Sequence, residues 1–256
     1  MKKFAAILLA SSMVLAVTAC GGSKEEAQTA PAETAEATEE TAADVPVMTH
    51  EEYMAAALDT PVCVETYVQA TQSWWDGVIT VYAQSEDGAY FLYNMACAEE
   101  DAAKLVPGQK IKVNGFKTEW SGEVEIVDAT FEFEEGSYIA EPADVTALLG
   151  TDELEAHQNE RVSFTDMTVE AKGEGGDAFL YAWDGSGSAD SDSDLYFDVS
   201  KDGKTYTFTV EYYLCGPGSD AYEAVRNLKV GDVIDIEGFM YWYEGPQTHV
   251  TGVTVK

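Results

Sequence analysis

An internal repeat constrains the fold of this chain more than any other feature of its sequence. The segment 105–127 recurs at 228–250, at a constant offset of 123 residues, and seven of its 23 positions are identical in the two copies. A unit that recurs in this way predicts two similar domains in tandem. Each copy keeps a pair of glycines seven residues apart, Gly108 with Gly115 and Gly231 with Gly238.

The residues around the repeat alternate between apolar and polar, which predicts β-strands. In each copy a glycine turn precedes the fourth strand, and the second glycine lets that strand coil as a small barrel requires. In the second copy, 160–171 and Tyr206–Tyr213 are predicted to be the first and third strands. The strands predicted for the first copy are Val62–Gln72, Gly77–Ser85, Ala89–Met95, Gln109–Glu119 and Val124–Phe133, with a helix at Ala98–Leu105 after the third.

Five strands with a helix between the third and the fourth form the OB-fold layout. On its two glycine motifs, the region 49–256 resembles the OB-fold domains of exported bacterial proteins, and as a tandem it resembles lipoproteins with two OB-like domains. We therefore expect a mainly β protein with two tandem five-stranded OB-fold-like barrels, each with a short helix between strands 3 and 4. The domains are predicted at 49–138 and 139–256, with Glu141–Gln158 as a helical connector. A plain β-sandwich is the alternative architecture.

The N-terminus has the order of parts found in an export signal. Lys2 and Lys3 precede an apolar run, Phe4–Val17, that is shorter than the roughly 20 residues of a membrane-spanning helix. The residues that follow, up to Cys20 and Gly21, resemble a bacterial lipobox. The resemblance implies a signal peptide at 1–20, a diacylglyceryl group on Cys20, and anchoring to the outer side of the cytoplasmic membrane. The alternative is an ordinary secretory signal.

Residues 21–48 differ from the rest of the chain in composition. They are rich in Ala, Glu and Thr and contain no aromatic residue. Such a segment buries too little apolar area to offset its ordering entropy, so we expect a disordered acidic tether.

The charge of the chain is strongly negative. Lys and Arg total 14 against 47 Asp and Glu, a net charge of −33. In the region 49–256, 11 basic residues face 40 acidic ones, a net charge of −29. Because binding of a phosphate backbone depends on Lys and Arg, this charge disfavours nucleic acid as a partner.

Aromatic residues cluster at predicted loops. Trp74 and Trp75 end the first strand, and Trp120 precedes the turn between strands four and five. These are the loops at which OB-folds usually bind ligands, so we expect the three indoles to form a stacking surface. The alternative is that the rings close the barrel ends or the contact between domains. The second copy contributes Tyr241, Trp242 and Tyr243 to the predicted ligand-binding residues.

An aspartate-rich loop is the only indication of a cofactor. Calcium takes six to eight oxygen ligands, and alternating Asp residues can supply several of them. The loop lacks a complete EF-hand pattern, so a solvated acidic insertion is the alternative to a calcium site. The candidate calcium ligands are Asp184, Asp190, Asp192 and Asp194.

The remaining polar groups predict no catalytic activity. His50, His157 and His249 lie outside any nucleophile or metalloprotease motif and are expected to be structural. Cys63 and Cys97 are predicted near strand ends, where either a disulfide or buried thiols fit the sequence.

We therefore predict a non-catalytic, lipid-anchored cell-envelope module that binds a glycan, peptide or protein through its barrel loops. The alternative is an interaction scaffold for another envelope protein, without a small ligand. Calcium is the one candidate cofactor, and nucleic acid is not among the predicted partners.

Overall fold

The computed structural model describes residues 45–256. The predicted signal peptide, Cys20 and nearly all of the predicted tether lie outside these residues. In the described part of the chain, no helix is long and apolar enough to cross a membrane.

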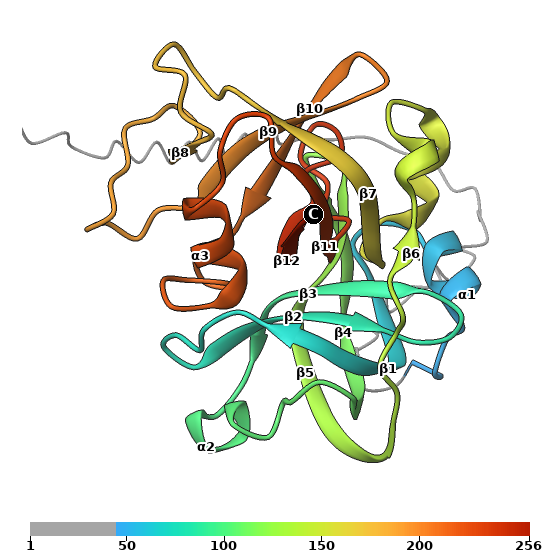
Figure 1. The fold of residues 1–256 in the computed structure, drawn as a ribbon. Helices are drawn as coiled ribbons and strands as arrows, with labels where there is room; N and C mark the ends of the chain where they lie inside the picture. Colours follow the sequence, from blue (N-terminus) through green and yellow to red (C-terminus); the bar gives the residue numbers. More distant parts are fainter. Residues whose placement is uncertain (1–44) are drawn as a thin grey trace, which may run out of the picture. The chain divides into compact units, whose positions relative to one another are not determined.

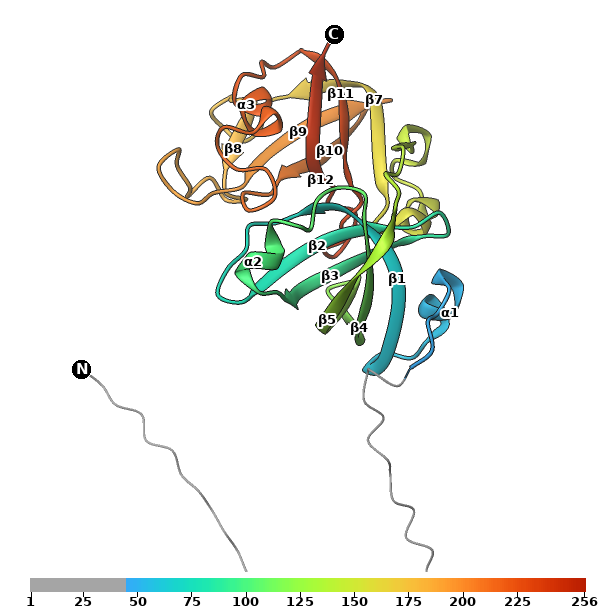
Figure 2. The same ribbon diagram turned by 90° about the horizontal axis from the view of Figure 1, so that it is seen from below.

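The first half of the described chain forms a closed barrel of five strands in the order β1-β2-β3-β5-β4 (Figure 2). Strands β3 and β5 pair in parallel, and the other neighbours are antiparallel. The short helix α2 (Glu99–Ala102) lies between the third and fourth strands, as predicted. The strands are β1 (Thr60–Thr71), β2 (Val78–Gln84), β3 (Ala89–Ala96), β4 (Gln109–Trp120) and β5 (Glu123–Ser137).

The second half repeats this arrangement. Its strands follow the order β7-β11-β12-β10-β9, and a pairing between β7 and β9 closes the ring (Figure 1). Helix α3 (Asp220–Arg226) again lies between the third and fourth strands, and the short strands β6 (Ala143–Asp144) and β8 (Phe179–Tyr181) extend the sheet. The barrel strands are β7 (Arg161–Glu170), β9 (Leu195–Lys201), β10 (Lys204–Val210), β11 (Val233–Phe239) and β12 (His249–Val255).

The prediction of two tandem five-stranded OB-fold-like barrels is therefore confirmed. Each barrel encloses a core of its own, with Leu92 and Ile111 in the first and Phe164 and Phe197 in the second, all fully buried. The alternating pattern of the strands produces these cores, because every second side chain points inward.

The repeated glycines have the same role in both copies. Gly108 and Gly231 have φ of +91° and +93°, a conformation that favours glycine, at the turn before the fourth strand. A Cβ on Gly115 would lie 2.9 Å from the Val127 carbonyl oxygen, and a Cβ on Gly238 would lie 2.4 Å from that of His249. These two glycines allow the fifth strand to approach the fourth where the pairing register shifts.

The segments outside the barrels are short. Helix α1 (His50–Ala55) starts with a capping box between Thr49 and Glu52. The predicted helical connector consists of β6 and the 3-10 helices η2 (Thr146–Leu148) and η3 (Asp152–His157). The domain boundary at 138/139 stays a prediction, although β5 ends at Ser137.

Cys63, Cys97 and Cys215 are free thiols in the structure. Of the two alternatives for Cys63 and Cys97, the structure has the buried thiols, and burial raises the pKa of both.

Aromatic residues of the two barrels form a small joint cluster of their own. The rings of Tyr82 and Phe239 stack with centroids 4.6 Å apart, and Phe91 packs edge-on against Tyr82 at 5.1 Å. The Tyr82 hydroxyl and His249 Nδ1 form a hydrogen bond of 2.6 Å. At Tyr82 and Phe91, the outer faces of β2 and β3 are therefore covered by the second barrel.

Candidate functional site

The turns between the fourth and fifth strands of the two barrels meet. In the first barrel, Ser121 and Gly122 both have positive φ, 53° and 93°, as a type I′ hairpin turn requires. The backbone N–H of Glu244, in the equivalent turn, donates to the Ser121 carbonyl at 2.7 Å. The rings of Trp120 and Tyr243, equivalent residues of the repeat, lie 5.1 Å apart. The repeat thus brings aromatic residues of both copies to one place.

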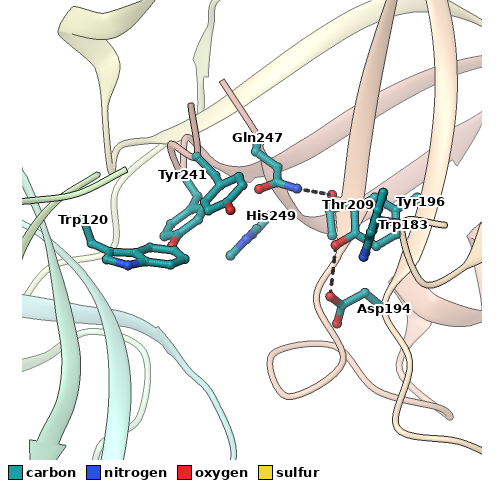
Figure 3. Close-up of a pocket in the computed structure, with 9 residues that line it drawn as sticks. Trp120, Trp183, Asp194, Tyr196, Thr209, Tyr241, Gln247 and His249 are labelled. Atoms are coloured by element: carbon teal, nitrogen blue, oxygen red, sulfur yellow. Dashed lines mark hydrogen bonds between the residues drawn. The ribbon is translucent and has the colours of Figure 1, made fainter. Parts of the chain in front are cut away.

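A cavity of about 590 Å³, here called the main cavity, opens beside this contact. Figure 3 shows Trp120 and Tyr241 on one side of it and Trp183 with Asp194 on the other. Trp120 is 53% exposed and Trp183 is 76% exposed, so much of the area of both indoles faces solvent. The main cavity is lined by Trp120, Trp183, Asp194, Tyr196, Thr209, Tyr241, Tyr243, Gln247 and His249.

His249 supports the wall of the main cavity as a neutral ring. Burial lowers its pKa to about 3, so it is uncharged at neutral pH. Its ring stacks on Tyr241 with centroids 4.2 Å apart, and its Nδ1 is held by Tyr82. These contacts fix the orientation of Tyr241 without placing a positive charge in the cavity.

A smaller cavity of about 270 Å³, here called the central cavity, is lined by Tyr93, Trp120, Glu125 and Tyr241. The Glu125 residue is only 6% exposed, and no described residue forms a hydrogen bond or ion pair with its carboxylate within the usual distances. Burial raises the pKa of Glu125 to about 7. The fully enclosed side-chain atoms of the described residues that have no hydrogen-bond partner include Glu123 Oε1 but neither oxygen of Glu125, so the Glu125 carboxyl group is accessible from the central cavity.

The alternation of β5 places Glu125 there. Val124 and Ile126 pack against the core of the first barrel, so Glu123 and Glu125 point outward. The second barrel covers this outer face, and both acids are buried as a result. Glu123 differs from Glu125 because one of its oxygens accepts a hydrogen bond from the Trp242 backbone N–H at 2.8 Å.

A third cavity of about 440 Å³, here called the outer cavity, includes Trp75, Tyr93, Asp192 and Tyr213 in its lining. Trp75 is 77% exposed and directly precedes Asp76 and Gly77, which have positive φ angles of 44° and 89°. Tyr93 lines both the outer and the central cavity. Trp120 and Tyr241 line both the central and the main cavity. We call these three adjoining cavities the aromatic groove.

The structure separates the aromatic residues predicted from sequence into two groups. Trp120, Tyr241 and Tyr243 line the main cavity together, and Trp75 lines the outer cavity. Two others support the barrels. The Trp74 indole donates to the Cys97 carbonyl at 2.9 Å and packs against the first core, and Trp242 packs against the second.

Several groove residues are not among the predicted ones. Tyr93 and Glu125 occupy outward positions of strands, where a polar side chain normally faces water. The sequence pattern therefore does not identify them as ligand-binding residues. Trp183 lies in the insertion that holds the acidic loop. Its signal is an isolated indole in a polar segment.

The aspartate-rich loop makes mainly local hydrogen bonds. Asp184 accepts from the Ser186 backbone N–H at 3.0 Å, and Asp194 accepts from the Tyr212 backbone N–H at 2.9 Å. Within 45–256, no group of three or more His, Cys, Asp or Glu side chains is arranged to hold a metal ion. Calcium binding by Asp184, Asp190, Asp192 and Asp194 stays a prediction. Asp192 lines the outer cavity and Asp194 the main cavity.

No protein-family model matches the chain, and no curated protein matches it in sequence. Solved structures do match. One, a murine DNA-binding protein bound to double-stranded DNA, is 11% identical, with 77% of this chain and 97% of that chain covered and a TM-score of 0.32. A p204 HINb domain is 11% identical, with coverages of 78% and 97% and a TM-score of 0.34. A replication protein A heterotrimer bound to single-stranded DNA is 10% identical, with coverages of 75% and 49% and a TM-score of 0.31.

Two predictions from the sequence need correction. They exclude nucleic acid from the partners and from the function of the expected envelope module, because basic residues are scarce. Solved structures similar to this chain include complexes with double-stranded and single-stranded DNA. The exclusion of nucleic acid is therefore wrong, and the predicted function that contains it is withdrawn. The physical reason is that net charge averages over a whole surface, whereas nucleobases also bind by stacking on aromatic rings.

Proposed function

We propose that the aromatic groove binds an organic cation, with Glu125 as its counter-charge. Glu125 carries this proposal, because this largely buried residue lines a cavity walled by Tyr93, Trp120 and Tyr241, and its carboxylate has no hydrogen-bond or ion-pair partner among residues 45–256. A cation held between aromatic faces and a carboxylate is attracted by both, since the face of an aromatic ring attracts positive charge. A bound cation also supplies a charged partner for the carboxylate of Glu125.

The charges around the groove support the same ligand class. None of the described residues that line the three cavities is a Lys or an Arg, and each cavity contains one acidic residue. The positive charge therefore has to come from the ligand. The net charge of −29 in the region 49–256 also raises the local concentration of cations.

The proposal includes the expectations for the N-terminus. The lipobox-like sequence ending at Cys20 supports export and lipid anchoring on the outer side of the cytoplasmic membrane. Binding without catalysis is also part of the proposal.

Choline is a suitable probe, because its trimethylammonium group is charged at every pH. Titration at pH 8 should quench the fluorescence of Trp120 and give a measurable affinity by calorimetry. The neutral isostere of choline, in which carbon replaces the nitrogen, should bind at least tenfold more weakly. It lacks both the cation–π interaction and the attraction to the Glu125 carboxylate. Glu125→Gln should lower choline affinity at least tenfold.

A matched control is Glu132→Gln, which makes the same change at an exposed position of the same strand. It should leave choline affinity unchanged. A single-stranded oligonucleotide and a neutral oligosaccharide should be titrated in parallel. Binding of either one by wild-type protein that does not bind choline would reject the proposal, because stacking alone would then explain the aromatic residues.

A further inference from the structure

The aromatic groove is longer than one ammonium group requires. The outer, central and main cavities adjoin in that order through shared aromatic residues, Tyr93 on one side of the centre and Trp120 with Tyr241 on the other. Their volumes are about 440, 270 and 590 Å³. A ligand that fills only the central cavity leaves the two larger ones unused.

Each of the three cavities has its own acid. Asp192 lines the outer cavity, Glu125 the central one and Asp194 the main one. Asp192 and Asp194 come from a single loop, which therefore supplies a carboxylate to both ends of the groove. Asp194 is held in place by hydrogen bonds from the Tyr212 backbone N–H at 2.9 Å and the Tyr196 hydroxyl at 3.3 Å.

Aromatic surface separates the acids. The rings shared between neighbouring cavities are Tyr93, Trp120 and Tyr241. Methylene groups pack well on such rings, whereas ammonium groups pair with carboxylates. A flexible chain with charges separated by methylene segments matches this order of groups.

We propose that the preferred ligand of the groove is a linear aliphatic polyamine that lies along all three cavities and pairs its ammonium groups with Asp192, Glu125 and Asp194. This inference rests on the proposed function and specifies its ligand class. An internal ammonium group occupies the Glu125 site, and the groups on either side of it extend past Tyr93 and past Tyr241. The charge complementarity along the groove selects this occupant over a neutral chain.

Calorimetry at pH 8 with propylamine, putrescine, spermidine and spermine tests the inference. Affinity should rise with the number of ammonium groups, and spermine should bind at least tenfold more tightly than choline. Asp192→Asn and Trp75→Ala alter only the outer cavity. Each should lower spermine affinity at least fivefold, and by a larger factor than it lowers choline affinity.

Asp202→Asn is the control for general attraction to an acidic protein. Asp202 is exposed, lines none of the three cavities, and has a φ of 51° that Asn also adopts. This variant should bind spermine like wild type. An equal loss in Asp202→Asn and Asp192→Asn would identify diffuse surface attraction and overturn the inference.

The remaining outcomes separate the two proposals. If choline binds in a Glu125-dependent way and spermine binds no more tightly, the polyamine inference fails and the proposed function stands. If neither binds, both fail. Tighter binding of a lysine-rich peptide than of spermine would replace the polyamine with a protein partner and overturn the inference.

Discussion

Glu123 and Glu125 show how position alone gives two like residues different properties. They are two residues apart on β5 and share its outer face. Burial raises the pKa of Glu123 to about 8 and that of Glu125 to about 7. Glu123 is fully enclosed and bonded to the Trp242 backbone, whereas Glu125 faces a cavity. Only Glu125 is therefore available to a ligand.

Tyr82→Phe tests the contact that holds the wall of the main cavity. The substitution removes the 2.6 Å hydrogen bond to His249, which leaves a buried ring nitrogen without its partner, and the 3.3 Å hydrogen bond that Gln72 Nε2 donates to the hydroxyl. We expect a loss of about 1–3 kcal/mol in the free energy of unfolding, measured by urea denaturation at neutral pH. Phe91→Leu, which removes a neighbouring ring but no hydrogen bond, is the packing control. Unchanged stability in Tyr82→Phe would contradict the assigned role of the Tyr82 hydroxyl.

At the scale of elements, the repeated turns produce both the barrels and the contact between them. The strand pairs and glycine positions were predictable, because the alternation of side chains and the positive φ of Gly108 and Gly231 are local properties. The 3-10 character of the connector was not predictable, because short 3-10 helices and short α-helices share the same sequence preferences.

Gly238→Ala should be the most informative substitution at this scale. Its Cβ would lie 2.4 Å from the His249 carbonyl oxygen, which belongs to the backbone and cannot rotate away. We expect a loss of about 1–3 kcal/mol in stability. Gly252→Ala is a matched control on β12, since its nearest contact would be an ordinary 3.7 Å. Equal thermal denaturation midpoints for the two variants would show that close approach of the strands does not require Gly238.

At the scale of the whole molecule, the site depends on how the barrels pack. Trp120 and Tyr243 were predicted as ligand residues and do meet at 5.1 Å, since they are equivalent residues of the repeat. Tyr93 and Glu125 were not predictable, because the cavities that they line are formed by residues of both barrels together. Trp74 and Trp242 had the same local sequence signal as the groove residues, and only tertiary packing shows that they face the cores.

The buried acids should make stability fall as the pH rises. Burial raises the pKa of Glu123 to about 8 and those of Glu125 and Glu211 to about 7, above the ordinary value near 4.5. Between about pH 4.5 and 8 the folded state holds protons that the unfolded state has released. The free energy of unfolding therefore decreases with pH, by up to about 1.4 kcal/mol per pH unit for each group.

Urea denaturation at pH 5, 6.5 and 8 measures this slope. Glu123→Gln should reduce this slope by up to about 1.4 kcal/mol per pH unit, the contribution of one titrating group, because the amide keeps a similar shape and does not titrate. A slope of the opposite sign, with stability rising over this range, would show that these carboxyl groups are ionised and paired in the folded state.

The most direct test of the binding account is the pH dependence of choline affinity, measured by calorimetry on wild type and Glu125→Gln at pH 6 and pH 8. Choline does not titrate, so a change in its affinity with pH reflects a change in the ionisation of the protein. With a Glu125 pKa of about 7, ionisation of this group should make the wild-type affinity about tenfold higher at pH 8 than at pH 6. Glu125→Gln should bind weakly and equally at both. Wild-type affinity that is the same at the two pH values, or retained in Glu125→Gln, would contradict the role of this buried carboxylate.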